Sequence, residues 1–306
     1  MKTFSVTEPW LDIECGLSEG PYLEHDENVL RFVDIMNNMV YRVDLDKGPS
    51  SLQKIEYENS VSVTADIEGS SDTFLYGGKY GIGVTSKDGT KTRVLHRYWN
   101  AKETAEGKPE QTRANDGAVD SQGRFWVSAV SDPLVKNFEP EGILFRLDLD
   151  GSFKRIVSPV TIGNGISWTK DDKTMYFTET QDKAIYTYDY DAQSGDISNK
   201  KLFFSVEEEG TGPDGHAMDE DGNIWAAIFG QWKVVRISPE GEVTAEVKLP
   251  VRCPSAVVFV GEDIYITSAE EAEPHKYPEG VEHGGSVFKC HVGIRGKPTT
   301  RAKLQV

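Results

Sequence analysis

Four short polar segments of the sequence hold oxygen-bearing side chains between glycine and proline residues. They are LSEGP with Glu19, RANDG with Asn115 and Asp116, GNGISW with Asn164, and GPDG with Asp214. Each of these residues precedes a short apolar run by a similar 10 to 12 residues. Any one segment alone could be an ordinary turn. As a set at matched spacing, two carboxylates and one or two amide carbonyls suit a hard divalent ion such as Ca²⁺, Mg²⁺ or Mn²⁺, whereas Zn²⁺ is less natural without His or Cys.

The apolar runs themselves recur along the chain. Six of them follow turn-forming, mostly acidic segments, at residues 30–34, 74–78, 125–129, 175–179, 224–227 and 264–268. Their second residues are separated by 44, 51, 50, 49 and 40 positions. Short strands repeating at this period predict an all-β fold, a six-bladed β-propeller with four-stranded blades. A linear β-solenoid is the structural alternative, although it requires shorter and more regular repeats.

The two ends of the chain are expected to complete the ring. An apolar strand at 4–13 precedes the first full repeat, and another at 286–292 follows the last one. We expect these N- and C-terminal strands to share a blade, which would remove exposed sheet edges and make residues 1–306 a single domain. The polar segments 99–112 and 269–285 are predicted to be rim loops, and the first could act as a lid.

Composition narrows the classes of partner. A net charge of −17 disfavours nucleic acid and anionic membrane surfaces. The sequence contains no apolar stretch of bilayer length and no secretory signal at its start. Cys15, Cys253 and Cys290 are widely spaced, which predicts buried thiols in a reducing cytoplasm. The sequence leaves the oligomeric state open.

The same segments resemble the SMP-30/gluconolactonase/regucalcin-like family of six-bladed propeller lactonases. The matching pieces cover nearly the whole chain and are LSEGP (17–21), RANDGAVDSQGRFW (113–126), GNGISW (163–168), GPDGHAMDEDGNIWAA (212–227) and GGSVFKCHVGIRGKP (284–298). The resemblance implies that Glu19, Asn164 and Asp214 hold the metal, and that Asp214 is also the general base. It implies that Arg113 binds the substrate and that Asn115 contacts the substrate or, as in some members, the ion. Some members place a substrate-contacting Glu after the third apolar run, where this chain reads VSDP (130–133), so the sugar specificity stays open.

The function implied by this resemblance is a metal-dependent lactonase that opens a sugar-derived or similar small lactone to its hydroxy acid. One divalent ion, with Ca²⁺ ahead of Mg²⁺, Mn²⁺ and Zn²⁺, would polarise the carbonyl while Asp214 activates water. The alternatives are a Ca²⁺-binding regulatory propeller without significant catalysis, and a metal-dependent esterase or phosphotriesterase. His216 is expected to be a structural histidine or a neighbour of the site, and Trp168 and Trp225 are expected to lie in the blade core.

Overall fold

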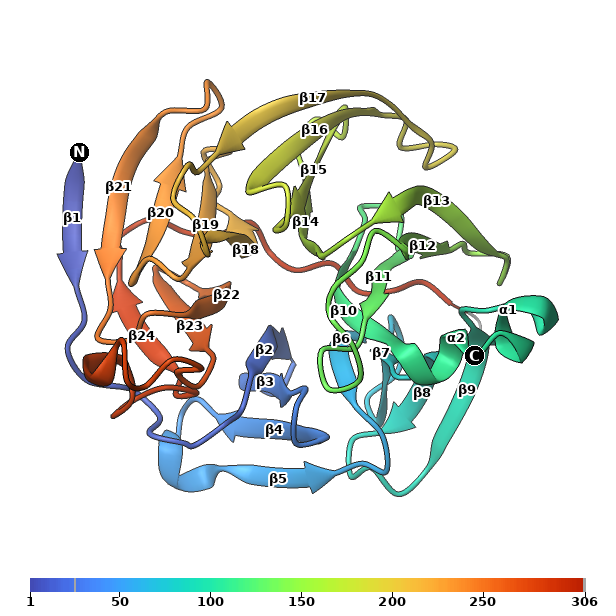
Figure 1. The fold of residues 1–306 in the computed structure, drawn as a ribbon, viewed down its shortest axis with the longest axis horizontal. Coiled ribbons are helices and arrows are strands. Elements are labelled where there is room, and N and C mark those ends of the chain that lie inside the picture. The colour runs from blue at the N-terminus through green and yellow to red at the C-terminus, as the bar shows by residue number, and fades with distance from the viewer. Residues whose placement is uncertain (25, 305–306) are drawn as a thin grey trace.

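The strands form six sheets arranged as a closed ring, and Figure 1 views this ring along its axis. The computed structural model describes residues 1–24 and 26–304. Within these residues each blade is an antiparallel sheet whose strands follow one another in sequence from the centre of the ring outward. The predicted six-bladed β-propeller is therefore confirmed.

The strand bounds follow blade by blade. Blade 1 contains β2 (Ser18–Glu24), β3 (Val29–Asp34), β4 (Met39–Asp44) and β5 (Gln53–Glu56). Blade 2 contains β6 (Val61–Asp66), β7 (Thr73–Gly78), β8 (Gly81–Ser86) and β9 (Thr92–Arg97). Blade 3 contains β10 (Thr112–Val119), β11 (Phe125–Ser131), β12 (Gly142–Leu147) and β13 (Phe153–Val160).

The second half of the ring repeats this pattern. Blade 4 contains β14 (Gly163–Trp168), β15 (Thr174–Glu179), β16 (Ala184–Tyr190) and β17 (Ile197–Ser205). Blade 5 contains β18 (Gly212–Met218), β19 (Ile224–Phe229), β20 (Lys233–Ile237) and β21 (Val243–Lys248). Blade 6 contains β22 (Pro254–Val260), β23 (Asp263–Ser268) and β24 (Phe288–His291).

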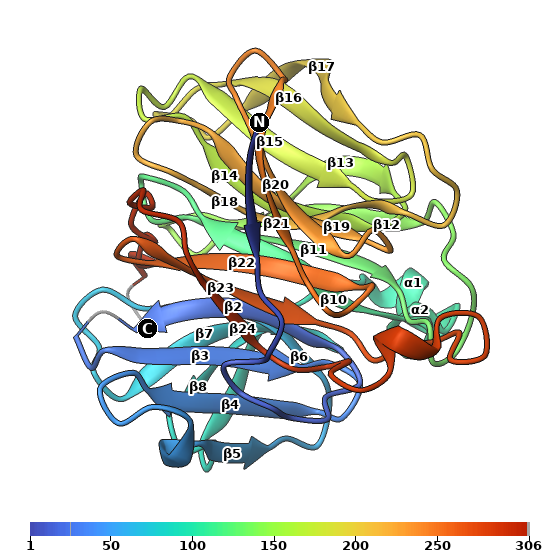
Figure 2. The same ribbon diagram turned by 90° about the vertical axis from the view of Figure 1, so that its left-hand side faces the viewer.

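The ends of the chain close the ring differently from the expected shared blade. The first strand, β1 (Lys2–Ser5), pairs in parallel with β21 on the outside of blade 5, as Figure 2 shows. Farther along the N-terminal segment, Leu11 pairs with Val287, next to β24 of blade 6, through two backbone hydrogen bonds of 3.0 Å each. The N-terminal segment therefore contacts both blade 5 and blade 6, because β1 extends the outer edge of β21 and the following residues still reach Val287. Closure itself comes from the inner strands: each lies beside that of the next blade, and β22 returns to β2.

Aspartates in the turns before two of the apolar runs accept hydrogen bonds from tryptophans in the blade cores. In blade 3 the Asp120 carboxylate accepts a hydrogen bond from the indole Nε1 of Trp126 at 3.0 Å, and in blade 5 Asp219 accepts one from Trp225 at 3.1 Å. Both tryptophans are fully buried between blades, and Trp168 is also buried. A blade's second strand contacts neighbouring sheets on both faces, which is why these strands are continuous apolar runs and not alternating ones.

Two short helices occupy the predicted rim segment. They are α1 (Ala101–Ala105) and α2 (Lys108–Gln111), and Asn100 caps α1 in a reciprocal arrangement with Glu103. Two 3₁₀ turns, Pro49–Ser51 and Pro278–Gly280, complete the helical elements of the described residues. None of the helices in this part of the chain is long and apolar enough to cross a membrane.

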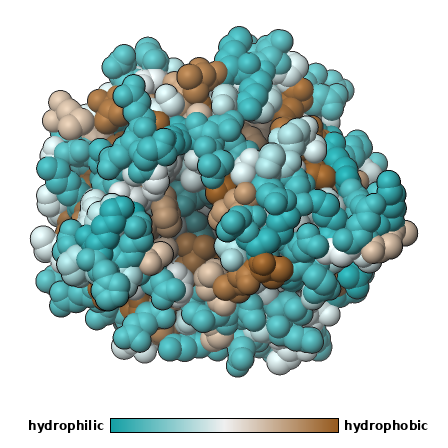
Figure 3. Space-filling view, in the orientation of Figure 1, coloured by the Kyte–Doolittle hydropathy of each residue, from teal (hydrophilic) through white to brown (hydrophobic). Residues whose placement is uncertain are grey.

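The C-terminal segment, residues 293–304, crosses one end of the ring as a strap that the sequence did not predict. It forms single bridges to blade 5 (Asp219–Gly296) and to blade 2 (Ile67–Ala302), and Figure 1 shows it in red behind the centre of the ring. The face turned toward the viewer is hollowed at the ring centre (Figure 3). The three cysteines are free and buried, as expected.

Candidate functional site

The predicted site residues lie on the innermost strands at β-bulges, and not in loops ahead of them. The strand register shifts between Glu19 and Tyr22 in β2 and between Ala114 and Gly117 in β10. Corresponding shifts occur in β14 after Gly163 and in β18 after Pro213. A bulge places an extra residue against the partner strand and redirects its side chain. Because the bulge recurs at the same place in each of these strands, the site residues are evenly placed before the apolar runs. In three of the four strands a glycine follows the site residue.

Three of the predicted residues contact one another directly. Arg113 donates from a terminal nitrogen to Asn115 Oδ1 at 2.8 Å, and Asn115 Nδ2 donates to Asn164 Oδ1 at 3.0 Å. The same Nδ2 is 3.1 Å from the carbonyl oxygen of Gly163. All three side chains are buried. This chain of hydrogen bonds links blades 3 and 4 and fixes the orientation of both amides.

Asp214 is connected to the same group through Thr180, a residue that the sequence analysis did not single out. Thr180 lies just beyond β15 and donates its hydroxyl to the carbonyl oxygen of Pro213 at 2.8 Å. It also accepts a hydrogen bond from Asn164 Nδ2 at 2.8 Å. Gly212 lets the two blades approach this closely, because a Cβ there would lie 2.7 Å from the Thr180 carbonyl oxygen.

Three carboxylates interact at this end of the inner strands, those of the buried Glu19 and Asp214 and of the half-buried Asp116. Burial raises the pKa of Glu19 to about 8, with the negative charge of Asp116 contributing in the same direction. Burial raises the pKa of Asp116 to about 6. The pKa of Asp214 is well above its ordinary value because of burial and the charges of Glu19 and Asp116. Like charges in a low-dielectric site disfavour ionisation of one another, so this arrangement calls for a compensating positive charge.

Arg113 supplies part of that charge. Its side chain is 3 % exposed, and burial lowers its pKa to about 10, partly offset by Asp132, Glu19 and Asp214. The guanidinium therefore stays protonated at neutral pH. Its Nε has no hydrogen-bond partner, which leaves one buried donor free for an oxygen atom of a ligand.

The arrangement fits a hard divalent cation. Within residues 1–24 and 26–304, Asp214 Oδ1 is buried without a hydrogen-bond partner. The Glu19 carboxylate accepts a hydrogen bond from the backbone N–H of Gly20 at 2.9 Å. Gly20 adopts a positive φ of 51°, which aims that N–H at the carboxylate. Among residues 1–24 and 26–304, no three His, Cys, Asp or Glu side chains form a ready metal cluster. The predicted set takes its third oxygen from the Asn164 amide, and oxygen-only ligands suit Ca²⁺ and Mg²⁺.

His216 is a satisfied structural histidine. Its Nε2 lies 2.9 Å from Ser167 Oγ and its Nδ1 lies 3.1 Å from Thr178 Oγ1. Burial lowers its pKa to about 3, so the ring is neutral at physiological pH. A Cβ on Gly165 would lie 2.3 Å from Nδ1, so the imidazole packs directly on that glycine. Both of its nitrogens are used within the fold.

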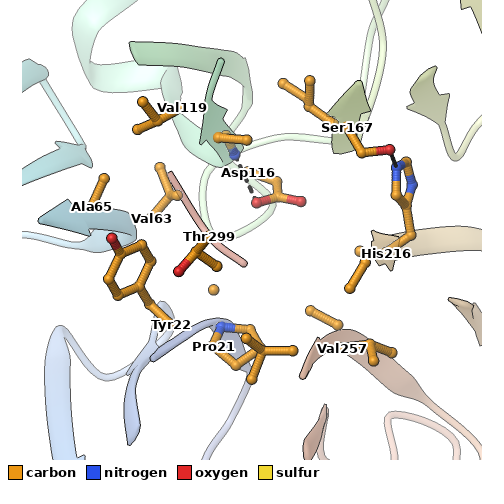
Figure 4. A pocket seen from close by; sticks show the side chains of 18 of the residues that line it. Pro21, Tyr22, Val63, Ala65, Asp116, Val119, Ser167, His216, Val257 and Thr299 are labelled. Carbon is orange, nitrogen blue, oxygen red and sulfur yellow. Dashed lines mark hydrogen bonds between the residues drawn. The ribbon is translucent and has the colours of Figure 1, made fainter. Parts of the chain in front are cut away.

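The channel also contains a cavity on the far side of the bulges, toward the C-terminal strap. All six inner strands line it together with residues 297–300, and Figure 4 shows Asp116 pointing into it. Glu19, Arg113, Asn115, Asn164 and Asp214 are not among its lining residues. Asp116 therefore faces the cavity and also interacts electrostatically with Glu19 and Asp214, two of the predicted ligands. Like Thr180, it has no role assigned to it in the sequence analysis.

A family model matches most of the chain. Residues 17–270 match the family described as the SMP-30/Gluconolactonase/LRE-like region. The chain belongs to this family. The matched range begins at the bulged strand β2 and ends just after β23, so it includes every predicted site residue.

Relatives in the family match nearly end to end. The pentonolactonase XacC of Haloferax volcanii is 30% identical over 303 residues, covering 97% of this chain and 98% of its own length. Regucalcin of Bos taurus is 31% identical over 297 residues, covering 93% of this chain and 94% of its own. Among solved structures, a calcium-binding regucalcin from Agrobacterium tumefaciens superposes with a TM-score of 0.88 at 19% identity, covering 99% of this chain and 100% of its own. That likeness shows the fold.

Proposed function

We propose that this protein is a metal-dependent lactonase that hydrolyses a sugar-derived or similar small lactone to its hydroxy acid. The observation that carries the proposal is the unpartnered, buried Oδ1 of Asp214, held near Glu19 and Arg113 at the centre of the ring. A buried carboxylate oxygen without a partner is costly in a purely structural site. It is useful where a cation and a reacting water must be held.

Glu19, Asn164 and Asp214 are the proposed ligands of one divalent ion, with Ca²⁺ expected first because all donors are oxygen atoms. Bound there, the ion would supply Lewis-acid chemistry, polarising the lactone carbonyl and stabilising negative charge on its oxygen. The Asn115–Asn164 hydrogen bond leaves a second lone pair of Asn164 Oδ1 for this purpose. The orientation of that oxygen is set by the fold before any ligand arrives.

The chain's own residues would carry the proton transfers and the positioning. Asp214 would accept a proton from the attacking water, whose oxygen bonds to the carbonyl carbon. The ring C–O bond then breaks, and its oxygen takes up a proton to become the hydroxyl of the product. Arg113 would donate to substrate oxygen atoms from its unpartnered Nε. Asn115 is the second proposed substrate contact, with its amide held by Arg113.

One relative supports the proposed lactonase, and another is consistent with the alternative function of calcium binding without catalysis. A protein named pentonolactonase at 30% identity across 97% of the chain supports lactone hydrolysis. A relative named regucalcin, at 31% identity, is consistent with the alternative of a calcium-binding propeller without significant turnover. The buried Arg113 favours the enzyme, because a site that only holds a cation gains nothing from a guanidinium beside it.

The test is hydrolysis of a panel of aldonolactones followed with a pH indicator, with and without a chelator. We expect acid release that the chelator abolishes and that added Ca²⁺, Mg²⁺, Mn²⁺ or Zn²⁺ restores to different extents. Tight Ca²⁺ binding without turnover of any lactone would support the regulatory rival. Hydrolysis of simple esters or phosphotriesters in preference to lactones would instead reassign the substrate.

A further inference from the structure

The connection between β11 and β12 exposes two large apolar side chains at the rim of the ring. Leu134 is 66% exposed and Val135 is 56% exposed. Exposed apolar residues are common on protein surfaces when they occur singly. Adjacent ones on the functional face of a protein raise the question of what covers them, because exposing them to water is unfavourable.

This connection is firmly held and is not a loose loop. Asp132 is buried and accepts the backbone N–H of Leu134 at 3.0 Å, while its carbonyl accepts the N–H of Val135 at 2.9 Å. At the base of the connection, the hydroxyl of Ser131 donates to Glu141 at 3.0 Å. The polar groups thus fix the turn from within, and the two apolar side chains are presented outward in a defined position.

The same connection borders the proposed site. Arg113 and Val130 are paired residues of β10 and β11, so the chain leaves β11 at the end of the blade where Arg113 lies. The N–H of Asp132 donates to the carbonyl of Gln111 in α2 at 2.8 Å. Lys79 joins the Asp132 carboxylate at 2.5 Å and the Glu110 carbonyl at 2.9 Å. Hydrophobic surface lies over this connection beside the central hollow in Figure 3.

We propose that Leu134 and Val135 form an apolar lip that receives an alkyl substituent of the lactone, so that alkyl-substituted lactones are preferred over fully hydroxylated ones. This inference rests on the proposed function and names its substrate class. Leu134 directly follows VSDP (130–133), at the point where the chain leaves β11 next to Arg113. Two adjacent exposed apolar side chains beside a proposed substrate contact favour an alkyl group over a hydroxyl group at this position of the substrate.

A protein partner is a weaker candidate for covering the lip. Stable protein interfaces bury roughly 800 Å² on each partner, far more than two side chains provide. The flanking residues are charged and paired with one another, as in the contact of Lys136 with Glu141 at 2.9 Å. A patch of this size suits a few methylene groups of a small molecule.

The experiment compares γ-lactones of increasing alkyl length, from γ-valerolactone to γ-nonalactone, with glucono-lactone. In the wild type we expect kcat/KM to rise about threefold for each of the first methylene groups, because an open lip removes most of a methylene's area from water. In the double variant Leu134→Ser, Val135→Ser this dependence on length should disappear. The matched control is Leu202→Ser, since Leu202 is 62% exposed on β17, an outermost strand. This control should retain the wild-type slope.

The proposal would be wrong if kcat/KM of the wild type did not depend on alkyl length, or if the double variant kept the wild-type dependence. Circular dichroism melts of both variants check that they fold. If no lactone of either kind is hydrolysed, the proposed function fails, and the lip is then judged by calorimetric binding of the same γ-lactones. Affinity that grows with alkyl length only in the wild type and the control supports it, and affinity independent of length refutes it.

Discussion

The hydroxyl of Thr180 lies between two blades and holds Asn164 in one orientation. It accepts Asn164 Nδ2 at 2.8 Å and donates to the Pro213 carbonyl at 2.8 Å, immediately before Asp214 in the sequence. With Nδ2 committed to Thr180, the amide oxygen of Asn164 must point the other way, toward Asn115. One hydroxyl therefore sets the relative position of two of the three proposed metal ligands.

Replacing Thr180 by valine should weaken metal binding. The change keeps the shape but removes the hydroxyl, so Asn164 Nδ2 and the Pro213 carbonyl both lose a partner. Residues that orient metal ligands typically contribute about 10–100-fold in affinity. We expect calorimetry to show a loss of that size for Ca²⁺, whereas Thr180→Ser keeps the hydroxyl and should bind nearly as tightly as the wild type. Equal affinities of a folded Thr180→Val variant and the wild type would show that Thr180 has no positioning role.

Asp214→Asn should remove turnover while leaving the protein folded. The amide keeps an oxygen for the cation but cannot accept the proton of the attacking water, so we expect kcat to fall by about 10²–10⁴-fold. Asp221→Asn is a suitable control, because the Asp221 carboxylate is 73% exposed in the turn before β19. Initial rates on the best lactone of the panel measure both. Full turnover by Asp214→Asn would disprove its assignment as the base.

Removal of divalent ions should lower thermal stability. Glu19, Asp116 and Asp214 disfavour one another's ionisation, and a bound cation would relieve that repulsion. A ligand at 100 times its Kd stabilises the folded state by about 2.7 kcal/mol. Calorimetric melts with chelator and with excess Ca²⁺ should therefore differ in Tm, and Glu19→Gln should reduce the difference. Identical melts in both conditions would contradict a metal site at this position.

The spacing of polar residues indicates the candidate site, because the inner strand of each blade that carries these residues has a β-bulge at the same place. Glu19, Asn115, Asn164 and Asp214 are all predicted from this pattern, although their place within strands is not. Thr180 escaped prediction because it follows a different strand, β15, and the tertiary contact between blades 4 and 5 brings it to the site. Hydrogen bonds across blades leave no periodic trace in a single sequence.

The path of the chain ends was predictable only in part. The need to close the ring follows from the repeat, and Leu11 does pair with Val287. However, an edge strand can extend either neighbouring sheet, and four residues of β1 have no pattern that selects blade 5 over blade 6. The strap at 293–304 lacks apolar periodicity because single bridges hold it in place, so nothing in its sequence indicates where it lies.

A buried ion-pair cluster in blades 1 and 2 should govern the acid stability of the protein. Glu24 is 1% exposed and contacts Arg31 at 2.8 Å, Arg42 at 2.9 Å and Lys87 at 2.9 Å. Burial alone would raise its pKa, but the hydrogen bond from Arg42, the charge of Arg31 and the hydrogen bond from Lys87 outweigh it and lower the pKa to about 2. The folded-state pKa thus lies below the ordinary value of 4.5.

The contribution of Glu24 to stability should be complete above about pH 4.5 and vanish as the pH falls toward 2, because the unfolded state takes up the proton first. The shift corresponds to on the order of 3 kcal/mol. Urea unfolding of the wild type and Glu24→Gln across this range should give curves that converge at low pH. At neutral pH the variant should be less stable by about 3–5 kcal/mol, since Arg31 is fully buried and loses a carboxylate.

The control variant is Glu27→Gln. The Glu27 side chain is 42% exposed, so this change should alter the free energy of unfolding by less than about 1 kcal/mol. Parallel curves for Glu24→Gln and the wild type would mean that the cluster does not control acid unfolding.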